Sequence, residues 1–126
     1  MPYSITWDEH GAYRRFCGII TKDDVRQSFK ELHEHPEYER LRCILHDETQ
    51  VTGRAFGKDD ILLLGANHLG ASVSNPTLID IVVTTDDEFI AMLKNDFVTN
   101  KMPTPIEFFS ILAEGEQRYK EIVGES

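Results

Sequence analysis

Histidine and carboxylate side chains are the groups in this chain that could perform acid–base catalysis or bind a metal ion. His46, Asp47 and Glu48 follow one another at the end of an apolar segment, where ligand sites of parallel sheets occur. Adjacent strand residues point to opposite faces, so His46 and Asp47 are not expected to act on one substrate atom. His33 and His35 are two positions apart and therefore lie on different faces of a helix. They fall in its last turn, where the helix dipole favours histidine. We therefore expect structural roles for these histidines.

Sequence motifs for nucleotide, metal or covalent chemistry are missing from the chain. It contains no Gly-Lys-Ser/Thr phosphate loop, no Gly-x-Gly-x-x-Gly, no Cys-x-x-Cys and no Gly-x-Ser-x-Gly. Its two cysteines, Cys17 and Cys43, fall within apolar strand-like segments, as expected for buried free thiols in a reducing compartment. No histidine is adjacent to Cys17 in the sequence, so we do not expect an activated thiolate there. The sequence predicts no enzymatic activity, no catalytic residues, no metal and no cofactor.

Two predicted helices are unusually apolar for helices that cover a sheet. Residues 61–64, Ile-Leu-Leu-Leu, are apolar around a full turn, which is typical of a helix buried on both sides or contacting a partner. Farther along the same helix, Ala66, Gly70 and Ser74 share one face at four-residue spacing. Small side chains in such a row allow another backbone to approach closely, or leave a space.

The next helix has an apolar stripe formed by Phe89, Leu93 and Phe97, which Met92 widens. Three readings remain open: the stripes only pack on the sheet, they form a dimer interface, or they enclose an apolar pocket between the two helices. Methionine and phenylalanine around a space would suit a small amphiphile, and His68 could contact its polar end. The residues expected to bind the ligand or to face a membrane are Leu64, His68, Phe89, Met92, Leu93 and Phe97.

Charge and hydropathy exclude several partners. The formal net charge is −9 and the isoelectric point is near 4.9, so the surface repels nucleic acid and we expect none to bind. No apolar stretch approaches the roughly 20 residues that span a bilayer. The N-terminus has neither a basic start nor an apolar core of the kind found in signal peptides. We therefore expect a cytoplasmic protein, with peripheral membrane association if an apolar patch overrides the overall charge.

Strand and helix patterns alternate along the chain, without an internal repeat or linker, and predict one domain over residues 1–126. Strand-like segments occupy residues 3–7, 12–20, 42–47, 78–83 and 106–109, and residues 48–57 read as a polar loop. Helices are expected from 21 to 35, 58 to 74, 86 to 95 or beyond, and 110 to 122, with Thr21 and the pair Thr85 and Glu88 as capping signals. The fold class is α/β: an N-terminal antiparallel strand plus four strand–helix units, forming a mostly parallel sheet of about five strands.

Several local phrases in this order resemble the SpoIIAA-like family of small bacterial proteins, related to STAS domains and anti-sigma-factor antagonists. The phrases are Ile5-Thr6-Trp7, Phe16-x-Gly18 followed by Thr21-x-x-Asp24, Pro36-x-Tyr38 with Leu41-Arg42, Asp47-x-Thr49-x-Val51, Ser74-Asn75-Pro76 and Phe109-Ser110. The resemblance covers nearly the whole chain. It implies a sheet with helices packed around it, often a dimer, and no enzyme.

The anti-sigma-factor antagonists of that family are switched by phosphorylation of a serine in the turn that opens the second helix. The corresponding turn here, residues 57–60, is Gly-Lys-Asp-Asp and has no hydroxyl. Asp59 and Asp60 instead place permanent negative charge where a phosphate would be added. The departure argues against a phosphorylation switch at this turn, and the nearest hydroxyls on which one could act, Thr49 and Thr52, lie earlier in the loop.

The sequence predicts a non-enzymatic binding domain that holds a small apolar or amphiphilic, lipid-like ligand. A membrane surface is a further expected partner, and the apolar surplus on the helices predicts a homodimer. The alternative is a STAS-type protein-interaction or regulatory module without the phosphorylatable serine.

Overall fold

The computed structural model describes residues 2–124, apart from the side chains of residues 67 and 72. In chain order the elements are β1 (Tyr3–Trp7), β2 (Gly11–Ile20), α1 (Lys22–Glu34), a short 3-10 helix (Tyr38–Arg40), β3 (Cys43–Arg54), α2 (Lys58–Ser72), β4 (Ile79–Val83), α3 (Asp87–Thr99), β5 (Ile106–Phe109) and α4 (Leu112–Gly124). The predicted α/β class, with its antiparallel first strand and four strand–helix units, is confirmed.

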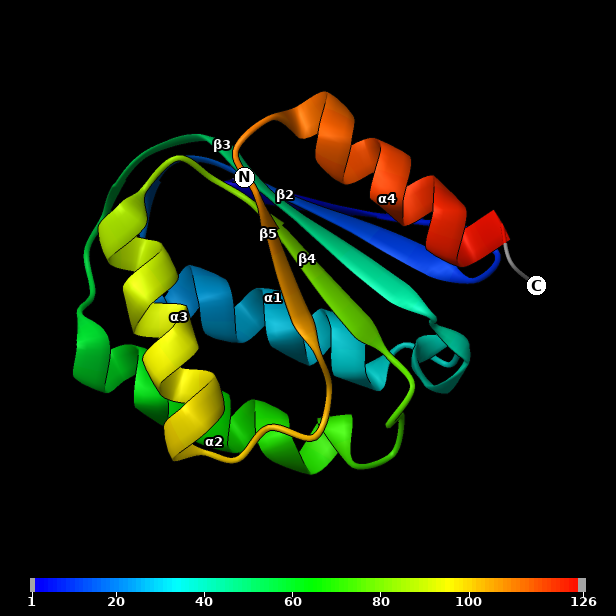
Figure 1. Ribbon diagram of the computed structural model, residues 1–126. Coiled ribbons are helices and arrows are strands. Elements are labelled where there is room, and N and C mark those ends of the chain that lie inside the picture. The colour runs from blue at the N-terminus through cyan, green and yellow to red at the C-terminus, as the bar shows by residue number, and fades with distance from the viewer. Residues whose placement is uncertain (1, 125–126) are drawn as a thin grey trace.

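The five strands form one sheet whose spatial order follows the sequence, β1-β2-β3-β4-β5. β1 pairs antiparallel with β2, and every later pair is parallel. Each parallel connection passes through a helix, and such crossovers are almost always right-handed. Because every step moves to the next strand in the same direction, α1, α2 and α3 all fall on one face of the sheet (Figure 1).

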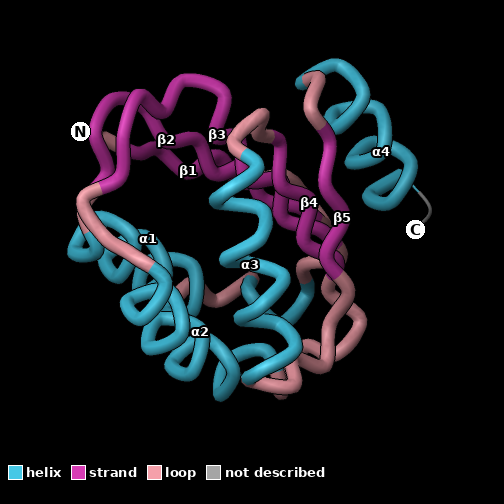
Figure 2. The backbone as a smooth tube through the Cα atoms, turned by 60° about the vertical axis from the view of Figure 1, so that its left-hand side comes forward, coloured by secondary structure: helices cyan, strands magenta, loops and turns pink. Residues whose placement is uncertain are grey.

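The last helix, α4, covers the opposite face alone (Figure 2). Tyr119 and Ile122 of α4 pack against Leu45 and Ile81 of the sheet. On the other face, Leu32 of α1 packs with Ile44 and Leu78, and Ile61 of α2 packs with Val82 and Phe89. Apolar side chains therefore fill both sides of β3 and β4, as in other parallel sheets covered by helices.

Capping residues begin the helices. The hydroxyl of Thr21 accepts a hydrogen bond from the amide of Asp24, as the sequence predicts, and the carboxylate of Asp24 also accepts one from the amide of Thr21. The predicted capping pair at α3 is wrong: Asp86 caps this helix by accepting from the amide of Phe89, so α3 begins one residue later than expected. An aspartate whose backbone is extended fills this role as well as a threonine does.

The predicted loop at residues 48–57 is also wrong in most of its length, because β3 continues to Arg54. Beyond Asp47, β3 pairs with β2 but no longer with β4, and its register with β2 shifts twice. Thr49 and Gln50 are exposed in this part of the strand. Because side chains in this part of β3 are exposed, its sequence is polar and resembles that of a loop.

Cys43 is buried as predicted, whereas Cys17 is exposed and the prediction for it is wrong. Phe16 points into the core, so its neighbour Cys17 points to the opposite face of the sheet. On that face α4 packs against the other end of β2, where Tyr119 approaches Gly11 so closely that a Cβ would not fit. The thiol is therefore left in solvent.

Candidate functional site

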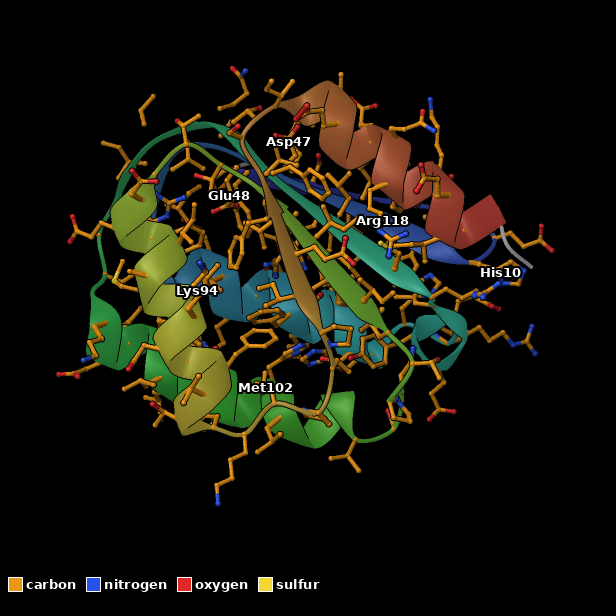
Figure 3. All side chains as sticks on the ribbon, in the orientation of Figure 1. His10, Asp47, Glu48, Lys94, Met102 and Arg118 are labelled. Atoms are coloured by element: carbon orange, nitrogen blue, oxygen red, sulfur yellow. The ribbon has the colours of Figure 1, made fainter. Side chains whose placement is uncertain are left out.

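An apolar chamber of about 80 Å³ lies between the sheet and the three helices α1, α2 and α3. Its walls include Phe29 of α1, Ile61 of α2, Val82 of β4 and Ile106 of β5. Four further apolar lining residues are only half-buried, and we call them the mouth of the chamber: Leu64, Leu93, Phe97 and Met102. Figure 3 shows Met102 beside the C-terminal part of α3.

Five of the six residues predicted from the sequence to bind a ligand line this chamber: Leu64, His68, Phe89, Leu93 and Phe97. Met92 does not. It packs in the cluster around Ile61, Val82 and Phe89 and lines a neighbouring groove. Within the described residues, the apolar stripe of α3 therefore packs both toward the sheet and toward α2.

Close packing of α2 on α3 depends on a glycine. A Cβ at Gly65 would overlap the carboxylate of Asp96, which is buried and hydrogen-bonded to the side-chain amide of Asn100 at 2.5 Å. The same Asn100 side chain donates to the carbonyl of Leu62, 3.2 Å away. Burial raises the pKa of Asp96. Both Gly65 and Asp96 line the chamber, so the two helices meet at its wall.

Polar and charged side chains lie on the sheet surface beneath the chamber. Arg14 of β2, His46 of β3 and Asp80 of β4 are all buried, and all three line the chamber. Strand alternation brings them together: Arg14 pairs in register with His46, and Asp80 pairs with Ile44, two residues before His46 on the same face. We call these three residues the polar floor.

The guanidinium of Arg14 has no carboxylate partner among the described residues. It lies over the rings of Phe16 and Phe29, 4.8 and 4.4 Å from their centroids, and donates from Nη1 to the hydroxyl of Ser28 at 3.0 Å. Its Nε is buried without a hydrogen-bond acceptor. Burial lowers the pKa of Arg14 to about 10, which still leaves the group charged at neutral pH.

His46 and Asp80 form a buried pair, with Nε2 of His46 2.8 Å from Oδ1 of Asp80. Burial and the nearby Arg14 charge lower the pKa of His46, although Asp80 opposes this. Burial raises the pKa of Asp80, but the hydrogen bond from His46 and the surrounding positive charge outweigh it and lower the pKa overall. At neutral pH the pair is therefore a neutral imidazole that donates from Nε2 to an ionised carboxylate. Nδ1 of His46 then carries a lone pair, and it is buried without a partner.

A second histidine pair lies on the helix side, where His68 lines the chamber and His33 packs against it. Nε2 of His33 in α1 lies 2.7 Å from Nδ1 of His68 in α2, and both rings stack with Phe29. Burial lowers the pKa of each histidine to about 4. One ring must donate and the other accept, so protonating both would place two N–H groups against each other.

Arg54 lines a larger groove of about 460 Å³ at the carboxyl ends of β3 and β4. It donates to Glu48 at 3.0 Å and to Asp86 at 2.6 Å, and its guanidinium lies 3.7 Å from the ring centroid of Phe89. Glu48 lines both the chamber and the groove. Its neighbour Asp47 lies on the other side of the sheet, toward α4 (Figure 3), and accepts from Arg15 at 3.1 Å. His46 and Asp47 thus point apart, as their adjacency in a strand predicts.

Among residues 2–124, no group of three or more histidine, cysteine, aspartate or glutamate side chains is arranged to hold a metal ion. In the same part of the chain, no helix combines the length and apolar character that crossing a membrane requires.

Sequence reasoning did not single out Arg14 or Asp80. The available signal was a charged residue at an inward position of an otherwise apolar strand, as in Ile79-Asp80-Ile81. His46 was identified as a strand-end residue, but its hydrogen bond with Asp80, 34 residues away, depends on the pairing of β3 with β4.

Comparison with known proteins adds no functional assignment: the sequence matches no protein-family model and no curated protein. The chemistry of the site therefore rests on its own residues.

Proposed function

We propose that this chain is a binding domain, without catalytic activity, for a small amphiphilic ligand, and that the chamber holds this ligand. The observation that carries the proposal is an apolar chamber closed by buried, incompletely hydrogen-bonded polar groups. A core that served stability alone would place apolar side chains there, because each unpartnered buried polar group costs about 1–3 kcal/mol. An amphiphile would satisfy both parts: its apolar end contacts the walls and its polar end meets the floor.

We also propose that the chain is related to the SpoIIAA-like proteins. The five-stranded mixed sheet, with its antiparallel first strand and surrounding helices, supports this relationship alongside the sequence phrases described above. The second candidate function, a STAS-type protein-interaction module, is favoured by apolar side chains that remain in solvent. Leu63 of α2 is 66% exposed and Val98 of α3 is 79% exposed.

The test uses hexan-1-ol as a small amphiphilic probe and methyl-labelled protein followed by NMR. We expect saturable shifts at the methyl groups of Leu64, Leu93 and Val82, which line the chamber. Leu64→Trp should abolish them by filling the mouth. Leu63→Trp, one position away on the exposed face, is the matched control and should bind as wild type does.

Native mass spectrometry of the purified protein provides a second readout. A co-purified small molecule that is lost in Leu64→Trp but retained in Leu63→Trp supports the proposal. If neither hexan-1-ol nor hexanoate causes saturable shifts and no small molecule co-purifies, the chamber is ordinary core packing. A protein partner captured only through Leu63 or Val98 would then favour the interaction module.

A further inference from the structure

We propose that the polar end of the ligand is an aliphatic carboxylic acid, bound in its protonated form between Arg14 and His46. The inference rests on the proposed function of the chamber and specifies the ligand class that the polar floor would select. It begins from two buried atoms without partners, Nε of Arg14 and Nδ1 of His46. These residues are register neighbours on adjacent strands, and both line the chamber.

The two atoms have complementary hydrogen-bonding roles. Nε of Arg14 carries a hydrogen and can only donate. Nε2 of His46 donates to Asp80, so Nδ1 of His46 can only accept. A protonated carboxyl group matches both, because its carbonyl oxygen accepts from Arg14 while its hydroxyl donates to His46. A hydroxyl can accept from Arg14 and donate to His46 only through a single oxygen atom, whereas a carboxyl group offers a separate oxygen to each partner, and a protonated amine cannot accept from Arg14.

Charge balance decides the protonation state of the ligand. In the floor, the Arg14 cation is balanced by the Asp80 anion, and at the border of the chamber Glu48 is paired with Arg54. The other titratable groups that line the site are His68 of α2, which is neutral at pH 7, and the buried carboxyl of Asp96 on α3; His33 of α1, also neutral, lies behind His68.

A carboxylate that entered without a proton would leave an uncompensated negative charge in this buried site, which is strongly unfavourable. A carboxylic acid adds none. If the proton moves from the acid to Nδ1 of His46, the result is a carboxylate between two cations and the net charge is the same. Because the free ligand is an anion at neutral pH, binding takes up one proton per ligand in either case.

The size of the chamber limits the part of the ligand that it encloses. Its volume of about 80 Å³ is roughly half that of an engineered 150 Å³ cavity that binds benzene. The carboxyl group and the first few carbons therefore fill it. A longer chain would extend past the half-buried mouth residues Leu93, Phe97 and Met102.

The experiment measures hexanoate and hexan-1-ol binding by calorimetry at pH 5.5, 6.5 and 7.5. An aliphatic carboxyl group has a pKa of about 4 to 5, so each pH unit above about 5.5 lowers its protonated fraction about tenfold. Hexanoate affinity should fall about tenfold per pH unit, while hexan-1-ol affinity stays constant. Titrations at pH 7.5 in buffers with different ionisation enthalpies should report uptake of about one proton per hexanoate.

The two proposals fail in different ways. If neither compound binds at any pH, the proposed function of the chamber is wrong. If hexan-1-ol binds but hexanoate binds without proton uptake, or does not bind at pH 5.5, the chamber is a ligand site and the carboxylic-acid assignment is wrong. These measurements use the wild-type protein, so they do not depend on whether a variant folds.

A pair of variants locates the contact. Arg14→Met should weaken hexanoate binding at pH 5.5 at least tenfold and leave hexan-1-ol binding in place. Arg15→Met is the matched control, because Arg15 is on the other face of β2, where it bonds to Asp47, and it should bind both compounds as wild type does. Equal hexanoate affinity in Arg14→Met and wild type would overturn the assignment of Arg14.

Discussion

Acidification should destabilise this protein well above the pH at which its carboxylates become protonated, because of the His33 and His68 pair. Burial lowers the pKa of both from 6.5 to about 4, so the folded state binds fewer protons than the unfolded chain between these values. For a base whose pKa is lower in the folded state, the free energy of unfolding keeps its full value above pH 6.5 and falls as the pH drops toward 4. The pKa of His46 is also lowered, so this residue likewise contributes to the loss of stability as the pH falls.

The shift at His68 corresponds to about 3 kcal/mol, since each pKa unit is worth about 1.4 kcal/mol. His33 is more exposed and coupled to His68, so its contribution is smaller. Such a loss is a large part of the 5–15 kcal/mol by which domains are usually stable. The raised pKa of Asp96 acts in the opposite direction, because a carboxyl with a raised pKa stabilises the fold at low pH and loses that contribution as pH rises. The lowered pKa of Asp80 has its effect only below about pH 4.

Urea unfolding at four pH values from 7.5 to 4.5, followed by circular dichroism, measures this dependence. We expect the free energy of unfolding to fall by about 3 kcal/mol or more in wild type, and by much less in His68→Gln. His10→Gln changes a histidine in the turn between β1 and β2, away from the chamber, and should leave the wild-type slope. A free energy that stays constant from pH 7.5 to 4.5, or an unchanged slope in His68→Gln, would refute the reasoning about the buried pair.

Four further predictions concern other parts of the molecule. Gly65→Ala should cost about 1–3 kcal/mol in thermal unfolding because its Cβ overlaps a buried side chain of α3, whereas Gly70→Ala, in open space on the same helix, should stabilise by up to about 1 kcal/mol. A maleimide should modify Cys17 rapidly, and Cys43 only after unfolding, because burial raises the pKa of the Cys43 thiol and removes it from solvent; equal rates in the native protein would contradict this. In vesicle co-sedimentation, wild type should pellet weakly and Val98→Asp less, because this exposed side chain of α3 is free to enter a lipid surface; equal pelleting would exclude it as the contact. Sedimentation at micromolar concentration should give a homodimer, and a monomer alone would contradict that expectation.

The sequence was sufficient for the architecture because the signals for strands and helices are local. Alternating and periodic apolar residues identify all five strands and four α-helices in the described chain, and the order of these elements implies the parallel crossovers. The stripe of Phe89, Leu93 and Phe97 was also visible, since helical spacing puts these side chains on one face. Both features depend on residues only a few positions apart.

Strand pairing and helix coverage decided the rest, and neither is local. Arg14, His46 and Asp80 become neighbours only because β2, β3 and β4 align in one register, and a shift of one residue would turn any of them to the other face. The exposure of Cys17 depends on where α4 ends on the sheet. The polar half of β3 is a strand because β2 provides its hydrogen-bonding partner. A local pattern shows which residues of one strand share a face. Only the packed sheet determines which side chains meet on that face and which polar groups remain without a hydrogen-bond partner.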